Sequence, residues 1–214
     1  HPNDALILST WNGEDSEELH RLSPFADAIL LNDSPAFAGD HSRNCQIRST
    51  LAGLAEAKRL GIRRVVKTRT DSVLASPDAL DRLDGALDRW PVEGRLRRFM
   101  RRRIAFLADA SWRYVPYHFT DQVMYGETDD MLDYWSAEFQ TEALTILSGT
   151  DSVLDLSRSG APPECYFAAS YLRRNGVDPV STIEHGWEML RDGFAAIDGH
   201  ALDWLWSKVM ALVE

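Results

Sequence analysis

Short apolar runs alternate with helix-prone segments through the first third of the chain. The apolar runs are residues 5–9 (ALILS), 27–31 (DAILL) and 62–70 (IRRVVKTRT). The segments between them, 14–22 and 44–61, have the composition or the spacing of helices. Strands that alternate with helices indicate βαβ units. The pattern therefore predicts an α/β fold with a mainly parallel central sheet flanked by helices.

Helical periodicity continues downstream. Segment 76–90 begins with Ser76 as a plausible N-cap and Pro77 at the first helical position. Segment 128–139 carries an apolar stripe, and 162–176 ends in Asn-Gly, a helix stop. Residues 114–126 (YVPYHFTDQVMYG) are expected to be extended, and 201–213 (ALDWLWSKVMALV) to form a last amphipathic segment that packs on the body.

The length and composition favour one domain. The chain has 214 residues, of which 44% are hydrophobic, so we expect a single domain over 1–214 with one sizeable core. The chain does not start with Met and shows no signal-peptide pattern, so we expect a piece of a longer protein. Cys45 and Cys165 form no CxxC motif, and we expect both to be reduced in a cytoplasmic protein.

The net charge of −10 argues against nucleic acid as a partner, because phosphate contacts need a basic surface. One stretch departs from this balance. Residues 94–108 (GRLRRFMRRRIAFLA) contain six arginines, no acid, and the interleaved apolar residues Leu96, Phe99, Met100, Ile104 and Phe106. A basic helix lying on the anionic inner face of the cytoplasmic membrane would have this composition. The alternative is a solvated basic face or a loop.

Several common site motifs are absent from the sequence. There is no GxGxxG after a strand, no phosphate-binding GxxxxGK[ST], no HExxH and no GxSxG, and the six histidines are dispersed. Ordinary zinc and dinucleotide chemistry are therefore not expected.

Polar residues follow each of the three apolar runs, at Ser9-Thr10-Trp11-Asn12, Asn32-Asp33 and Arg69-Thr70-Asp71. Ligands of open α/β sheets bind outside the carboxyl ends of the strands, so we expect these residues to converge on a site. Asp33 could bind a ribose hydroxyl and Trp11 could lie against a base or sugar. The alternative is that Ser, Asn and Asp simply form turns here.

Lys67, Arg69 and Asp71 stand at alternate positions and should project from one face of a strand. Two cations and a carboxylate suit a phosphorylated ligand, with Asp71 as a ligand for Mg²⁺ or Mn²⁺. The alternative is a surface ion pair, which stabilises a protein by roughly 0–1 kcal/mol.

The stretches LSTWNG, ILLNDSP, NCQIRSTLAGLAEA, VVKTRTDS, TDQVMYGETDDMLDYW and PECYFAASYL resemble, in order and spacing, the WavE lipopolysaccharide-synthesis family. The resemblance spans about residues 5–176. It implies a Rossmann-like glycosyltransferase fold of the GT-A type that binds a nucleotide-sugar donor.

The resemblance also implies roles for individual residues. Ser9, Thr10, Trp11 and Asp33 would line the nucleotide site, and Asn44, Gln46 and Arg48 would face phosphate at a helix start. The Lys67-Thr-Arg69-Thr-Asp71 stretch takes the place of the GT-A metal motif, usually Asp-x-Asp. Arg69 stands where the first carboxylate would be, so Mn²⁺ or Mg²⁺ would depend on Asp71 as its protein ligand.

Glu164 follows Pro162-Pro163 and matches the family's Pro-Glu pattern. It is the first choice for the base that takes the proton of an acceptor hydroxyl. The alternative is that Glu164 only stabilises the first turn of its helix. Asp121, in TDQVMYG, is the second choice; it could hold the acceptor hydroxyl or cap a turn.

The sequence thus predicts an enzyme that moves a sugar from a nucleotide-sugar to a glycan or lipid-linked glycan acceptor in cell-surface polysaccharide assembly, with inversion at the anomeric carbon. Two alternatives remain open. One is a sugar-phosphate nucleotidyltransferase, and the other is a non-catalytic module that docks a larger polymerase onto the membrane through residues 94–108.

Overall fold

The first part of the fold is a small parallel βαβ unit. A computed structural model of the protein describes residues 5–143 and 162–207. Strands β1 (Ile7–Trp11) and β2 (Ala28–Asn32) pair in parallel, and helix α1 (Ser16–Leu22) connects them. The two apolar runs and the intervening helix are therefore confirmed, and they form a sheet of two strands.

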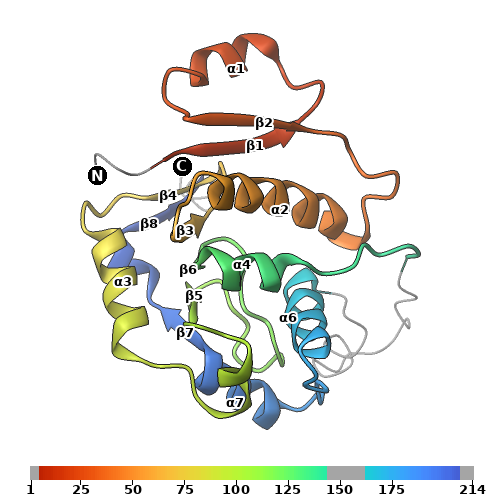
Figure 1. Ribbon diagram of the computed structural model, residues 1–214, viewed down its shortest axis with the longest axis vertical. Coiled ribbons are helices and arrows are strands. Elements are labelled where there is room, and N and C mark those ends of the chain that lie inside the picture. The colour runs from red at the N-terminus through yellow and green to blue at the C-terminus, as the bar shows by residue number, and fades with distance from the viewer. Residues whose placement is uncertain (1–4, 144–161, 208–214) are drawn as a thin grey trace.

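Helix α2 (Arg43–Arg59) separates this small sheet from the rest of the molecule (Figure 1). Ile47 and Leu54 are buried on the helix, and an added Cβ at Gly53 would lie 3.7 Å from the Cβ of Ser9 on β1. An alanine at position 53 would thus still fit in ordinary van der Waals contact with the strand. Gly61 follows the helix with a φ of 73°, as the predicted stop requires.

The larger sheet has four strands in the order β3-β6-β5-β7. Strand β6 (Met124–Glu127) runs antiparallel to both β3 (Arg64–Lys67) and β5 (Ile104–Leu107), and β7 (Phe194–Ile197) runs parallel to β5. The expectation of a mainly parallel central sheet is therefore wrong. The third apolar run pairs with a strand about sixty residues further along the chain, and local periodicity carries no information on such a partner.

Both faces of the four-stranded sheet are buried. On β5, Ile104 and Phe106 belong to one hydrophobic cluster, while Ala105 and Leu107 belong to a second. Helices α4 (Thr128–Trp135) and α6 (Pro163–Arg174) cover the first face, and α3 (Ala79–Arg89) covers the second (Figure 1).

The remaining elements close the two ends of the fold. Helix α7 (Ile183–Gly193) leads into β7, and β4 (Ser72–Leu74) pairs antiparallel with β8 (Trp204–Trp206). The described residues also form the 3-10 helices η1 (Asp40–Ser42), η2 (Gly94–Arg98) and η3 (Gly199–Leu202). The predicted last segment, 201–213, contains β8, and its residues from 208 onward lie outside the described part.

Some predicted boundaries shift. Helix α3 starts after Asp78, two residues beyond the predicted N-cap Ser76, whose hydroxyl bonds the Asp78 carboxylate. Of the segment 114–126, only the part in β6 is a strand. Cys45 and Cys165 are both in the thiol form rather than in a disulfide, as expected.

The arginine-rich stretch is not a surface helix. It forms η2 and then runs into β5, and Leu96, Met100, Ile104 and Phe106 are buried in the core. The expected apolar membrane face is therefore absent from this stretch, because those side chains fill the space between the sheet and α7. None of the described helices is long and apolar enough to cross a membrane.

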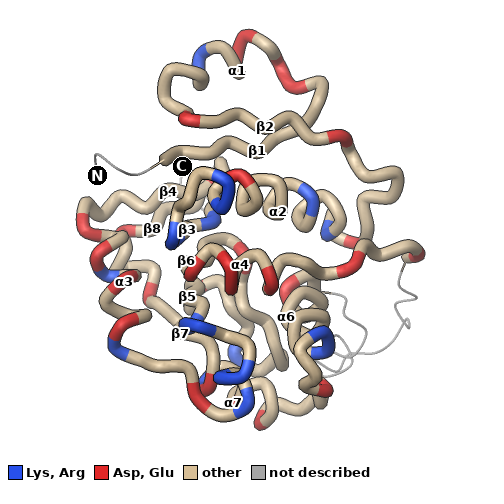
Figure 2. Tube along the Cα trace, in the orientation of Figure 1, with Lys and Arg blue, Asp and Glu red and all other residues tan. Residues whose placement is uncertain are grey.

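The arginines of this stretch lie next to acidic positions of neighbouring elements (Figure 2). Arg101 pairs with Asp129 at 2.8 Å, and Arg102 pairs with Asp88. Arg103 is buried and donates to the backbone carbonyls of Pro91 and Phe194. Several of these arginines thus stabilise the fold through ion pairs and hydrogen bonds.

Candidate functional site

Lys67, the last residue of β3, meets Asp121 in the loop before β6. Its Nζ lies 2.8 Å from Asp121 Oδ2 and also donates to the Asp121 backbone carbonyl. The same Nζ lies 5.0 Å from the centre of the Trp135 ring. The two paired side chains are only 13% and 7% exposed. The fold thus joins two predicted site residues that are 54 positions apart.

Arg69 and Asp71 form a second pair just beyond the end of β3. Arg69 Nε lies 2.8 Å from Asp71 Oδ1, and Nη2 lies 3.0 Å from Oδ2. Trp206 Nε1 donates to the same carboxylate at 3.2 Å. The hydrogen bonds that Arg69 itself donates to Asp71 raise the pKa of Arg69. The predicted strand alternation does not reach these residues, because β3 ends at Lys67, and a turn brings them together instead.

Glu164 lies in the first turn of α6, as its position after two prolines predicts. Burial raises the pKa of its carboxyl, and the negative charge of Asp121 raises it further, while Lys67 and Arg69 act in the opposite direction. We call Lys67, Arg69, Asp71, Asp121 and Glu164 the acid–base cluster. It contains three carboxylates and two cations, and each cation pairs with an aspartate.

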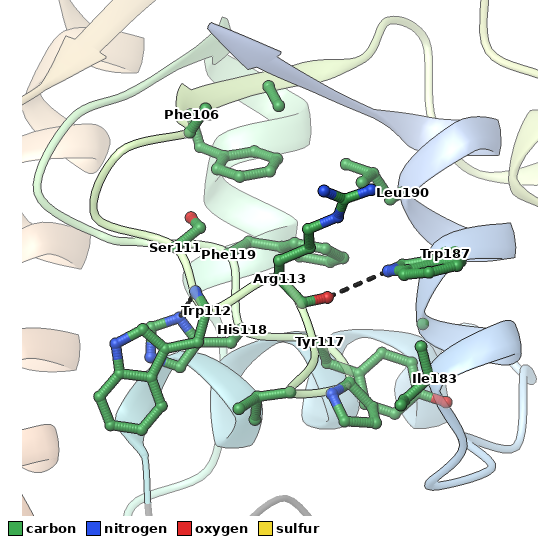
Figure 3. Close-up of a pocket in the computed structure, with 15 residues that line it drawn as sticks. Phe106, Ser111, Trp112, Arg113, Tyr117, His118, Phe119, Ile183, Trp187 and Leu190 are labelled. Carbon is green, nitrogen blue, oxygen red and sulfur yellow. Dashed lines mark hydrogen bonds between the residues drawn. The ribbon is translucent and has the colours of Figure 1, made fainter. Parts of the chain in front are cut away.

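His118 faces the carboxylate of Glu164, with its Nε2 3.8 Å from Oε2. Its ring stacks on Trp112 at 4.6 Å and 9°, and the backbone N–H of Trp112 donates to Nδ1 (Figure 3). Nδ1 is therefore an acceptor, and in the neutral ring the hydrogen is on Nε2. Burial lowers the pKa of His118 to about 4. At neutral pH His118 is thus uncharged, and its Nε2–H faces Glu164 without placing a positive charge next to that carboxylate.

Sequence reasoning missed His118. A local signal existed, since the histidine lies three positions before Asp121 in the same loop. The preceding residue, Tyr117, has a left-handed backbone with a φ of 64°, which is strained for a bulky side chain. Its hydroxyl donates to the carbonyl of Val180 at 2.5 Å, which anchors the loop beside the cluster.

A buried tyrosine borders the cluster and was also missed. The Tyr134 hydroxyl on α4 has no hydrogen-bond partner among the described residues. Burial raises the pKa of Tyr134, and the charges of Glu164 and Asp121 raise it further. A buried hydroxyl without a partner is uncommon in folded proteins. Next to the acid–base cluster, therefore, at least one buried polar group lacks a hydrogen-bond partner among the described residues.

The residues predicted to bind the nucleoside lie on the other sheet. Ser9 accepts from Asn32 at 2.9 Å and donates to the carbonyl of Ser49 on α2. Asn12 donates to Asp33 at 2.5 Å, so the ends of β1 and β2 meet as expected. Thr10 donates to Glu14, and Trp11 is half-buried at the end of β1. The end of β3 belongs to a different sheet, so the three strand ends do not share one edge.

The predicted polar cluster at the start of α2 has mixed roles. Asn44 is buried, donates to the carbonyls of Phe37 and Gln140, and accepts from the backbone of Gln140, so it connects two loops. Gln46 donates to the carbonyl of His41, and the Arg48 guanidinium lies 5.2 Å from the Phe139 ring. Gln46 Oε1 and Arg48 Nε have no partner within the described part of the chain.

Arg43, at the start of the same helix, was not predicted. It is completely buried, with its guanidinium 4.6 Å from the centre of the Tyr166 ring. Burial lowers its pKa, and the charge of Asp40 partly offsets this.

The profile of one protein family, described as WavE lipopolysaccharide synthesis, matches residues 1–152. This chain belongs to the WavE lipopolysaccharide synthesis family. The match includes four members of the acid–base cluster and ends before Glu164, so Glu164 is supported by its surroundings rather than by the profile. Searches of curated proteins and of solved structures gave no match.

Asp71 of this WavE protein was expected to be a ligand of Mn²⁺ or Mg²⁺. In residues 5–143 and 162–207 there is no group of three or more His, Cys, Asp or Glu side chains placed to hold a metal ion. The Asp71 carboxylate is bound by Arg69 and Trp206. The described residues therefore do not fit a divalent-metal site built by the protein, and we derive no chemical step through a metal.

Proposed function

We propose that this WavE protein is a glycosyltransferase of the GT-A type, which moves a sugar from a nucleotide-sugar donor to a hydroxyl of a glycan or lipid-linked glycan. Family membership supports a role in lipopolysaccharide synthesis. The observation that carries the transferase proposal is Glu164, a carboxylate that is only 18% exposed and has a raised pKa, beside two cations and a neutral histidine. Perturbed titratable groups of this kind concentrate at catalytic sites.

The proposed reaction is a single displacement. The acceptor oxygen attacks the anomeric carbon, the bond from that carbon to the diphosphate oxygen breaks, and the nucleoside diphosphate leaves with the electron pair. Glu164 takes the proton of the acceptor hydroxyl. Attack from the side opposite the leaving group inverts the anomeric centre. Asp121 is the second choice as base, because Lys67 already compensates its charge.

The cations have a separate role in this proposal. Arg69 is 36% exposed, so a donor diphosphate could reach it and replace Asp71 as its partner. Lys67 and Arg69 would then stabilise the charge that develops on the leaving group. The residues predicted to face phosphate lie at the start of α2; they are Asn44, Gln46 and Arg48. The nucleoside would bind at Ser9, Thr10, Trp11 and Asp33.

The test is a thermal-shift screen with UDP, GDP, CMP and TDP, each with and without Mn²⁺. A ligand at 100 times its dissociation constant adds about 2.7 kcal/mol to the free energy of unfolding. We expect one nucleotide to raise the melting temperature. Arg69→Met should abolish the rise, and Arg63→Met, which removes an exposed arginine next to β3, should preserve it.

Other results would overturn or redirect the proposal. A rise that needs Mn²⁺ would support the predicted metal at Asp71. Release of pyrophosphate instead of nucleoside diphosphate would favour the nucleotidyltransferase. No response to any nucleotide, together with binding to anionic liposomes that depends on the arginines of 94–108, would favour the docking module.

A further inference from the structure

A cavity of about 210 Å³ lies between the segment 106–119 and helix α7 (Figure 3). Its wall consists mainly of apolar and aromatic side chains, among them Phe106, Val115, Phe119, Ile183 and Leu190. Phe106, Val115 and Phe119 are buried, whereas Trp112 and Trp187 at the rim are 55% and 44% exposed. The cavity is therefore apolar inside and reachable from solvent.

Several polar groups of the wall are already engaged, while the Arg113 guanidinium also lines the cavity and points toward Leu190 (Figure 3). Trp187 Nε1 donates to the carbonyl of Arg113 at 3.0 Å, and the Tyr117 hydroxyl donates to Val180. Ser111 donates to the carbonyl of Leu107, and His118 Nδ1 accepts from Trp112. A sugar ring inside the cavity would lose hydrogen bonds to water and find few replacements. A hydrocarbon chain would incur no such loss.

The cavity adjoins the acid–base cluster through one residue. His118 lines the cavity and also faces Glu164, with its Nε2 3.8 Å from the carboxylate. A molecule with an apolar group in the cavity would therefore extend its polar end toward Glu164.

We propose that this cavity binds the apolar aglycone of the acceptor, an alkyl or acyl chain, and so selects a lipid-linked acceptor over a free glycan. The proposal rests on the glycosyltransferase function proposed above and names the substrate class of that site. Chain length beyond the sugar then determines affinity, because each methylene that enters the cavity leaves water.

The experiment measures binding of methyl, butyl, hexyl and octyl β-glucoside by tryptophan fluorescence, below the concentration at which the longest forms micelles. We expect affinity to rise about fourfold per methylene until the cavity is filled. Trp187→Ala should reduce this dependence, and Trp90→Ala is the matched control, since Trp90 is also 44% exposed but lies outside the cavity. Ala196→Phe fills the cavity from an exposed wall position and should also abolish the dependence.

Equal affinity for all four glucosides would overturn the proposal, as would the same dependence in the Trp187 and Ala196 variants as in wild type. The nucleotide screen separates this failure from failure of the transferase. A nucleotide response without chain-length dependence leaves the transferase standing and removes the aglycone site. Chain-length dependence without any nucleotide response removes the acceptor assignment together with the transferase.

Discussion

Two ion pairs at the end of β3 have the same closest distance and differ in their surroundings. The closest nitrogen–oxygen distance is 2.8 Å both in Lys67–Asp121 and in Arg69–Asp71. The first pair is 13% and 7% exposed, and the second is 36% and 21% exposed. Burial, rather than distance, decides what each pair does, because a buried charge that loses its partner cannot be solvated by water. The inner pair is therefore the one whose disruption costs more stability, and the outer pair is available for exchange with a ligand.

Glu164 is the third carboxylate of the cluster, beside Asp121 and Asp71 of the two ion pairs. Lys67 and Arg69 each face an aspartate, and the near neighbour of the Glu164 carboxyl is the neutral His118. Burial raises the pKa of Glu164, and the charge of Asp121 raises it further. A carboxyl in this position holds a proton more readily than an ordinary glutamate. The predictions below probe the difference between the three carboxylates.

The largest expected effect is on catalysis. Glu164→Gln should lower kcat about 10²–10⁴-fold, because amide nitrogen cannot take the acceptor proton. The measurement is steady-state transfer to a lipid-linked acceptor, with the nucleotide thermal shift as a check of donor binding. Glu184→Gln is the control, since Glu184 is also an acidic residue in the first turn of a helix. Equal effects of the two variants would mean that Glu164 only stabilises its helix.

The same enzyme should show a characteristic pH profile. Glu164 must be ionised to act as a base, and its pKa is raised above 4.5. The value of kcat/KM should therefore increase with pH through that raised pKa and level off above it. An acid limb at or below pH 4.5 would contradict the assignment.

The next largest effect is on stability. Lys67→Met leaves the Asp121 carboxylate buried without its cation, and breaking a buried pair in this way costs about 3–5 kcal/mol. Urea unfolding at pH 7 measures this cost. The double variant Lys67→Met with Asp121→Leu should recover part of the loss, because it removes both charges. No recovery would show that the packing of Lys67 on Trp135, rather than its charge, was lost.

His118 should make stability depend on acid. Its pKa is about 4 in the folded protein and 6.5 in the unfolded chain, so the unfolded state binds more protons between these values. Its contribution is therefore full above pH 6.5 and falls by about 3 kcal/mol as the pH drops to 4. The free energy of unfolding of His118→Gln should decline less over this range than that of wild type. Parallel curves would contradict the neutral, buried histidine.

The smallest effect is expected at the outer pair. Arg69→Met should change the free energy of unfolding by only about 0–1 kcal/mol, because its partner Asp71 is partly exposed and also bound by Trp206. Urea unfolding beside Lys67→Met makes the comparison direct. A cost as large as that of Lys67→Met would remove the distinction between the pairs.

Local periodicity predicted most of the elements and little of their pairing. The runs at 5–9 and 27–31 became β1 and β2, and the spacing of Ile47 and Leu54 predicted α2. The sequence did not predict strand β5, because its residues follow three arginines and the whole stretch resembled a basic helix. Its alternating inward residues serve two faces, which produces a continuous apolar run rather than a period of two.

The sequence predicted which residues belong to the candidate site, but not which of them contact one another. Lys67, Asp121 and Glu164 were all selected from the sequence, but only the fold pairs Lys67 with Asp121 and brings His118 to Glu164. Asn44 was selected for phosphate, and the fold adds that its side-chain amide connects backbone segments. The chemistry of a side chain can be read locally, whereas its burial depends on residues far along the chain.

Strands β7 and β8 have a consequence for where this protein can be divided. Both lie beyond residue 152, where the family match ends, yet β7 pairs with β5, β8 pairs with β4, and Trp206 binds Asp71. The family boundary is thus not a folding boundary. A fragment cut there would expose the edge of β5 to other chains, and such edges promote aggregation. Pairing in these sheets must also wait until β7 and β8 have been synthesised, so the nascent chain exposes unpaired strand edges until then.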